Sequence, residues 1–232
     1  MQKRKIRISI VLSVIAAIAS ILVGCNIIGK TYNQNSDNTI YQIGDSTNYL
    51  GIFRDKDQQI INSLPIKLVV TGGYYPGKKQ TRIEWIYNQL GQDDGENITE
   101  WTGVIDSDEK FFIHPPRLGV FEILSFADFP TISTKSFKDS TSFYSFSGEI
   151  TMLKEYNGTQ VTKVITEQSY KGKTTISFSD NSLGGRVHHT HATAKSAVGL
   201  IAGDYYFSET KGFVRLKYTL PDSSSISIEI IK

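Results

Sequence analysis

Apolar residues recur at every second position along much of the chain, which is the spacing of side chains on one face of a β-strand. Residues 64–70, 82–87 and 225–231 are the clearest runs of this kind. Gly, Pro, Asn and Asp residues separate such runs at intervals of roughly ten residues, as in hairpin-rich proteins. We therefore predict a mainly-β fold: an antiparallel sandwich or an open, partial barrel built from meander hairpins.

Specific turn signals and one helix are predicted inside this pattern. Asn157-Gly158 is a strong hairpin signal and joins strands predicted over residues 143–156 and 159–170. Lys171-Gly172-Lys173 predicts a further turn. Residues 119–126 form another apolar run, and the Ala-rich residues 195–203 are the one predicted short helix.

A weakly patterned stretch rich in Ser, Thr and Lys divides the predicted strands into two groups. This stretch, residues 131–142, is predicted to be a linker. It separates an N-terminal β module, residues 49–130, from a C-terminal β-meander module, residues 143–232. The alternative is a single domain over residues 49–232.

The N-terminus carries the features of a secretory signal, predicted over residues 1–24. Four basic residues precede an apolar run from Ile8 to Val23, and small residues end it. The alternative is an uncleaved transmembrane helix, but a run of about 16 residues is shorter than the roughly 20 needed to span a bilayer.

The signal ends in Leu22-Val23-Gly24-Cys25, which resembles the lipobox of bacterial lipoproteins. The resemblance implies cleavage between Gly24 and Cys25, a diacylglycerol on the Cys25 thiol and N-acylation of Cys25 with a fatty acid such as palmitate. The implied partners are the membrane and the lipoprotein-processing and sorting machinery. Residues 205–218 also resemble the tails of Gram-negative envelope lipoproteins, and this resemblance implies no activity.

Residues 25–48 follow the signal and are rich in Asn, Ser, Thr and Gly, so we predict that the lipidated cysteine continues into a flexible tether. In enterobacterial sorting, Asp after the lipidated cysteine retains a lipoprotein at the inner membrane. Asn26 stands at that position here. The expected location is therefore the bacterial cell envelope, with the outer membrane favoured.

Charge and cysteine content exclude several kinds of partner and site. Removing residues 1–24 leaves 208 residues, and the basic count falls by four, from 25 to 21, against 23 acidic residues. The net charge of about −2 implies no nucleic-acid partner. Cys25 is the only cysteine, so we expect no disulfide, thiolate metal site or cysteine nucleophile.

Three of the four histidines lie close together, as His188, His189 and His191. On a strand, His189 and His191 share one face and His188 lies on the other. His189 and His191 are weak candidates for a metal site, because no third ligand can be assigned from sequence. We expect a structural histidine face and no cofactor.

The tetrapeptide His114-Pro115-Pro116-Arg117 has a backbone fixed by two prolines. Its charged groups could form an anion clamp. The alternative, which we favour, is a stiff strand exit whose charges face water.

Aromatic residues gather in the first half of the chain, and the candidates for ligand contact are Tyr74, Tyr75, Trp85 and Trp101. Flat aromatic faces suit sugar rings and acyl chains. Trp85 alternates with Ile83 and Tyr87, as a core residue does, whereas Tyr74 and Tyr75 lie in a Gly/Pro-containing loop.

These observations predict a lipid-anchored envelope protein that is not an enzyme. The leading hypothesis is a binding or structural module, with a lipid or other apolar molecule as ligand. One alternative is a glycan-binding or adhesion module that uses exposed aromatics. The other is a metal-dependent hydrolase built on His189 and His191. The chain contains no Gly-x-Ser-x-Gly or His-Glu-x-x-His motif.

Overall fold

The structure is a computed structural model that describes residues 40–73, 80–88, 97–106, 110–133, 143–156, 160–177, 186–196 and 198–231. Side chains are not described over residues 143–177. Residues 35–232 form one compact unit.

Twelve strands and one 3₁₀ helix make up the described part of the chain. They are β1 (Ser46–Arg54), β2 (Ile60–Gly73), β3 (Gln80–Asn88), β4 (Asn97–Asp106), β5 (Lys110–Ile113), η1 (Gly119–Phe126), β6 (Thr131–Ser133), β7 (Phe143–Tyr156), β8 (Gln160–Ser177), β9 (Arg186–Ser196), β10 (Gly199–Ser208), β11 (Gly212–Thr219) and β12 (Ser225–Ile230). The prediction of a mainly-β, antiparallel fold is confirmed.

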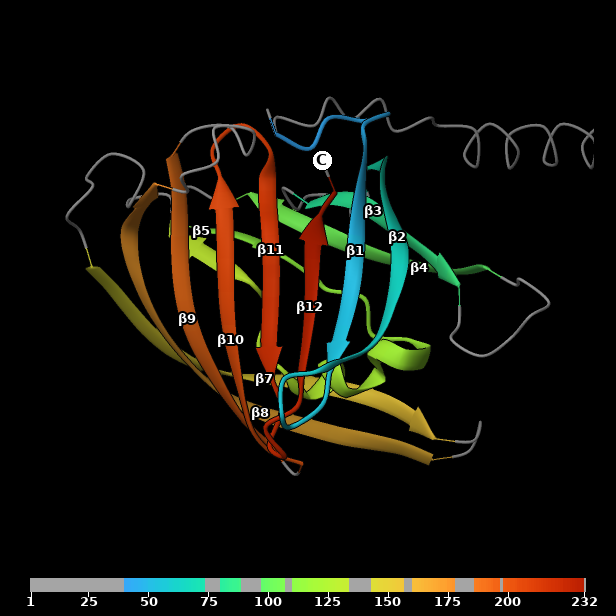
Figure 1. Cartoon of the computed structure of the whole chain (residues 1–232), viewed down its shortest axis with the longest axis vertical. Coiled ribbons are helices and arrows are strands. Elements are labelled where there is room, and N and C mark those ends of the chain that lie inside the picture. The colour runs from blue at the N-terminus through green and yellow to red at the C-terminus, as the bar shows by residue number, and fades with distance from the viewer. Residues whose placement is uncertain are drawn as a thin grey trace, which may run out of the picture. The chain divides into compact units, whose positions relative to one another are not determined.

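All twelve strands belong to one sheet, in the order β6-β5-β4-β3-β2-β1-β12-β11-β10-β9-β8-β7. Strands that follow one another along the chain pair with each other, except β6 and β7, which form the two edges of the sheet. In addition, the last strand, β12, pairs with the first, β1 (Figure 1). This pairing joins the strands of both predicted modules into one sheet. The strands of the two predicted modules therefore do not form two separate sheets.

The inner face of the sheet carries the core. Ile83, Trp85 and Tyr87 on β3 are buried, as their period-two spacing predicts, and they share this face with the apolar residues of β2. On β11 and β12 the inner face carries Leu216, Tyr218, Ile226 and Ile228, also buried. On β2 and β3 the pattern alternates because one face of the strand is covered and the other is more exposed, whereas on β12 Ser225 and Ser227 are buried as well.

The sheet curls until its ends approach each other. The short edge strand β6 lies against β9 and β10, and η1 contacts β8 and β9. The Phe121 ring on η1 packs edge-on against the Tyr87 ring, with the ring centroids 5.1 Å apart. Its centroid lies 5.4 Å from that of Phe53. The helix thus fills part of the space inside a partial barrel.

The helix is not where the sequence placed it. Residues 195 and 196 end β9 and residues 199–203 begin β10, with Gly199 at a φ of +115°. Residues 199–203 pair with residues 192–196 of β9, so cross-strand pairing overrides the local helix propensity of this segment.

Two other predictions need correction. Lys171-Gly172-Lys173 is not a turn, because β8 continues through it, paired with β9. The folded unit also begins before residue 49: β1 starts at Ser46, and Tyr41 is buried at 3% exposure. β7 and β8 pair antiparallel as far as Tyr156 and Gln160, and the predicted turn residues Asn157 and Gly158 lie outside the described part.

Candidate functional site

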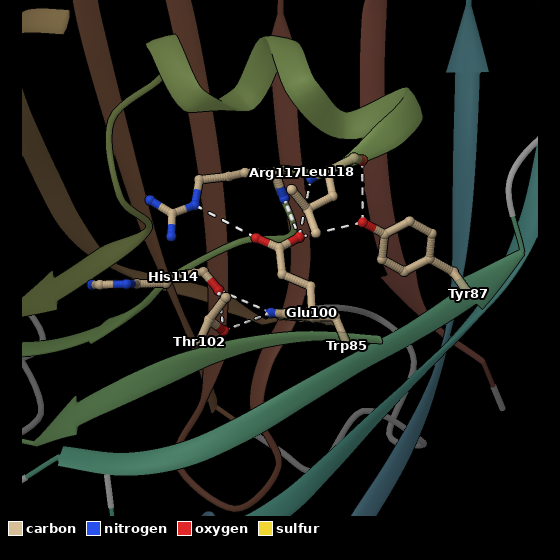
Figure 2. Close-up of polar contacts among 7 residues, drawn as sticks. All are labelled: Trp85, Tyr87, Glu100, Thr102, His114, Arg117 and Leu118. Carbon is tan, nitrogen blue, oxygen red and sulfur yellow. Dashed lines mark hydrogen bonds and ion pairs between the residues drawn. The ribbon is translucent and has the colours of Figure 1, made fainter. Parts of the chain in front are cut away.

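A buried carboxylate organises the polar interior on the β3–β4 side of the sheet (Figure 2). Glu100 on β4 is 8% exposed. Its Oε2 accepts the backbone N–H groups of Arg117 at 2.6 Å and Leu118 at 3.1 Å, and the Tyr87 hydroxyl at 3.3 Å. The guanidinium Nε of Arg117 lies 3.8 Å from Oε1.

The two prolines explain why these two amides reach Glu100. Pro115 and Pro116 are buried and have no N–H to donate. Arg117 and Leu118 supply the first two donors after them, and both bind the same carboxylate. The segment is thereby fixed across the inner face before η1 begins.

A second set of hydrogen bonds holds the start of this segment. The Trp85 indole N–H donates to the His114 carbonyl at 2.9 Å and to the Thr102 hydroxyl at 3.1 Å. The Thr102 hydroxyl also donates to the His114 carbonyl, at 3.2 Å. These bonds satisfy the indole of a fully buried tryptophan, which is the usual requirement for such a group.

Burial dominates the electrostatics of this network. It raises the pKa of Glu100, and the Arg117 N–H, the Arg117 charge and the Leu118 N–H partly oppose the shift. Burial and then the nearby Glu100 raise the pKa of Tyr87. Burial, with the Arg117 charge beside it, lowers the pKa of His114 to about 4, and the ring stacks on Phe129 at 4.3 Å.

Neither hypothesis for His114-Pro115-Pro116-Arg117 describes this arrangement. The Arg117 side chain is 23% exposed and faces the protein's own carboxylate rather than an external anion or open water. The network is a structural clamp between β3, β4 and η1. Sequence reasoning missed Glu100, because nothing in the chain marks a pairing across 17 residues.

A second buried carboxylate lies where the curled sheet closes. Asp128 is fully buried, and its Oδ2 accepts the Tyr205 hydroxyl at 2.6 Å. Its Oδ1 has no hydrogen-bond partner among the described groups. Burial raises the pKa of Asp128 to about 6, while the Tyr205 hydrogen bond lowers it in part. This contact links the segment before β6 to β10.

The histidines of β9 fall on two faces. His188 points inward at 1% exposure, and its Nε2 lies 2.5 Å from Oε1 of Glu209. His189 and His191 lie on the outer face and share one carboxylate oxygen. Oδ1 of Asp204 lies 2.8 Å from Nε2 of His189 and 3.0 Å from Nδ1 of His191.

Asp204 is held ionised by this pair. Its partial burial raises the pKa, but the hydrogen bonds to His189 and His191 and their charge outweigh it, so the pKa lies below its ordinary value. The His189 ring also stacks on the Tyr206 ring, with the centroids 4.6 Å apart. The Arg215 guanidinium lies 5.6 Å from the Tyr206 ring centroid and 3.2 Å from the Glu229 carboxylate.

This histidine face is therefore a ladder of cross-strand contacts. Within the described ranges, no group of three or more His, Cys, Asp or Glu residues is arranged to hold a metal ion. Nothing in the sequence indicated that Asp204 is the partner of these histidines, because its position opposite His191 depends on the register of β9 and β10.

The candidate aromatic contacts separate into three groups. Trp85 is fully buried, so it is a core residue and not a ligand-contacting one. Trp101 on β4 is 58% exposed, with the Arg82 guanidinium 3.9 Å from its ring centroid and Glu84 2.9 Å from Arg82. Tyr74 and Tyr75 lie outside the described residues, as do Gly24 and Cys25.

A cleft of about 480 Å³ opens at one end of the sheet. Its apolar lining includes Ile40, Val70, Ile230 and Ile231, and its charged lining consists of Asp45 and Lys211. The start of β1, the end of β12 and the β10–β11 turn meet there (Figure 1). We call this the anchor-side end, because the described chain enters the sheet there and the candidate anchor residue Cys25 precedes this point in the sequence.

Comparison with known proteins gives two structural likenesses. A "putative lipoprotein" from Parabacteroides distasonis is 12% identical, with a TM-score of 0.42, and the match covers 84% of this chain and 98% of that one. A "putative exported protein with YmcC-like fold" from Bacteroides fragilis is 10% identical, with a TM-score of 0.37 and coverages of 83% and 99%. The chain matches no protein-family model and no curated protein sequence.

In the part of the chain that the structure describes, no helix has the length and hydrophobicity needed to cross a membrane.

Proposed function

We propose that this chain is a lipid-anchored protein of the bacterial cell envelope, held at Cys25, and that its sheet is a non-enzymatic binding module for a small amphipathic ligand. The observation that carries the ligand proposal is the cleft at the anchor-side end. Its volume of about 480 Å³ lies within the range of small-molecule sites.

The lining of the cleft supports an apolar body with a polar head as the ligand. Ile40, Val70, Ile230 and Ile231 provide apolar contact, while Asp45, Thr210 and Lys211 provide polar groups at the same site. A site with this mixture orients a ligand through few polar contacts and gains affinity from apolar burial. A lipid or fatty acid has this chemistry.

The polar clusters support a module without catalysis. The Glu100 carboxylate is occupied by two backbone amides and a tyrosine hydroxyl, and Asp204 by two histidines. Each cluster connects elements of the fold, so a structural role accounts for its polar groups.

Binding at the cleft can be tested with a dansylated fatty acid as the probe. Thr47, which lines the cleft, is half-buried, so Thr47→Trp should fill part of the space and weaken binding at least tenfold. Thr193→Trp, at a half-buried position on β9 away from the cleft, is the matched control and should bind like the wild type. Equal affinity of both variants would remove the cleft as the binding site.

Anchoring can be tested separately through Cys25. Cys25→Ser removes the only thiol of the chain, so labelled fatty acid should enter the wild type alone, and the signal should remain uncleaved in the variant. Fractionation of the wild type would then test the outer-membrane proposal that Asn26 supports. Equal labelling of both proteins would reject the lipid anchor.

A glycan-binding function has one observation in its favour. The exposed Trp101, stacked with Arg82 beside Glu84, presents an aromatic face flanked by charges on the outside of the sheet. Such a face suits a sugar ring. Trp101→Ala should abolish binding of chito-oligosaccharides measured by calorimetry, and absence of binding by the wild type would dismiss this alternative.

A further inference from the structure

The chain is fixed in the core where it enters the anchor-side end. The hydroxyl of Tyr41, 3% exposed, accepts the backbone N–H of Phe213 at 2.9 Å, and its ring stacks on Phe111 at 5.8 Å. Gly212 makes room for it: its φ is +76°, and a Cβ there would collide with the Tyr41 hydroxyl. The position of Tyr41 relative to the sheet is therefore set.

Chain length limits how far this end can lie from the membrane. Tyr41 follows Cys25 by 16 residues, which span at most about 56 Å when fully extended. A flexible tether of that length, as the sequence predicts, would have an average end-to-end distance of about 22 Å. The nine residues of β1 add about 30 Å to the opposite end of the sheet. The anchor-side end is thus the part of the fold that an anchored chain brings to the bilayer.

Two isoleucines are exposed at this end. Ile43 is 50% exposed and precedes Gly44, whose N–H binds the Val70 carbonyl. Ile231 is 47% exposed and follows β12, with its N–H bound to the Asn48 carbonyl. Backbone hydrogen bonds therefore hold both residues beside the cleft while their side chains meet solvent.

We propose that the anchor-side end docks on the lipid bilayer that holds Cys25, with Ile43 and Ile231 inserted at the membrane interface and the cleft opening toward the lipid. This inference rests on the proposed lipidation of Cys25. The charged residues of the cleft, Asp45 and Lys211, have opposite signs, so docking is driven by apolar insertion rather than by net charge. A ligand leaving the bilayer would enter the cleft without crossing water.

The test uses the mature chain, residues 25–232, produced without lipid and coupled through Cys25 to a pyridyl-disulfide lipid in phosphatidylethanolamine/phosphatidylglycerol vesicles. Because Cys25 is the only cysteine, coupling places the anchor at the natural position. Reduction then cuts the anchor, and the rate of release from the vesicles is measured. Three proteins are compared: the wild type, Ile43→Asp with Ile231→Asp, and Ile60→Asp with Ile61→Asp. Ile60 and Ile61 are 61% and 66% exposed at the opposite end and serve as the matched control.

We expect the wild type and the control to leave the vesicles at least threefold more slowly than the Ile43/Ile231 variant, with little change between low and high salt. Equal release of all three proteins, or faster release of the control, would overturn the docking proposal. Melting curves check that each variant is folded, and the milder pair Ile43→Ser with Ile231→Ser replaces one that is not. Chemical coupling does not depend on lipidation in the cell, so failure of docking and failure of the Cys25 anchor are separate results.

Discussion

Two aspartates of the fold respond to pH in opposite ways because their surroundings differ. Asp128 is buried with one hydrogen-bond donor, whereas Asp204 is half-exposed between two histidines. Burial raises the pKa of Asp128, whereas the partial burial of Asp204 is outweighed by its hydrogen bonds with His189 and His191, which lower its pKa. Each difference from the unfolded value makes the stability of the protein depend on pH.

Asp128→Asn should stabilise the protein at high pH. The folded pKa of about 6 exceeds the unfolded value of about 3.9, so the folded state binds more protons between these values and stability falls as pH rises through that window. Asn removes the buried charge and keeps an oxygen for the Tyr205 hydroxyl. We expect a gain of about 2 kcal/mol at pH 8 that shrinks toward zero near pH 4, measured by urea unfolding.

The companion variant Tyr205→Phe removes the donor to Asp128 and should act in the opposite direction. Its cost should be larger at pH 8, where the carboxylate is charged, than at pH 4. A destabilising Asp128→Asn at pH 8 would show that the buried carboxylate contributes favourably.

Asp204→Asn should destabilise the protein at neutral pH. The folded pKa lies below the unfolded value, so the contribution is present above about pH 4 and is lost as pH falls through the folded pKa. Because the residue is partly exposed, we expect a loss of only about 1 kcal/mol at pH 7. Thermal unfolding at pH 7 and pH 3 would check this, and an equal difference at both pH values would contradict it.

Among elements, the contact between β10 and the segment before β6 depends on a glycine. Gly203 lies under the Tyr205 ring, and a Cβ there would collide with the Tyr205 hydroxyl. Gly203→Ala should therefore displace Tyr205 from Asp128 and cost about 2 kcal/mol or more of unfolding free energy.

Gly51→Ala on β1 is the matched control for this variant. Its Cβ would lie 3.0 Å from Ile66 Cδ1 and 3.2 Å from Phe121 Cζ, which are side-chain atoms that can shift by a few tenths of an ångström. We expect a cost below about 1 kcal/mol in denaturant unfolding. Similar costs for the two variants would show that the Tyr205–Asp128 contact has no special part in closing the sheet.

The same elements show what could be predicted from sequence. Period-two spacing identified the core positions of β2 and β3, because each of these strands has one covered face. It failed for residues 195–203, whose alanine content suggested a helix although the described residues belong to the paired strands β9 and β10. The partners of Glu100 and of His189 and His191 depend on chain crossings and strand register, which local pattern does not determine.

At the scale of the whole molecule, one continuous sheet should unfold in one step. The two tryptophans, Trp85 and Trp101, lie in the first half of the chain, so their fluorescence reports on β3 and β4. Far-ultraviolet circular dichroism reports on all strands. The two probes should give the same urea midpoint, as in two-state unfolding. Separate midpoints would indicate that the first and second halves unfold independently.

The burial of Tyr41 also has a mechanical consequence. Under the proposed lipidation of Cys25, tension on the anchor would reach the fold at Tyr41 and pass into β1, a strand that lies between β2 and β12. A pull along the axis of a strand loads its hydrogen bonds to both neighbours together, in shear, instead of opening them one after another. Because β12 is the last strand, the hydrogen bonds between β1 and β12 join the start and the end of the folded chain and carry part of this load. Drag on the exposed domain would therefore be resisted by the middle of the sheet and not by its edges.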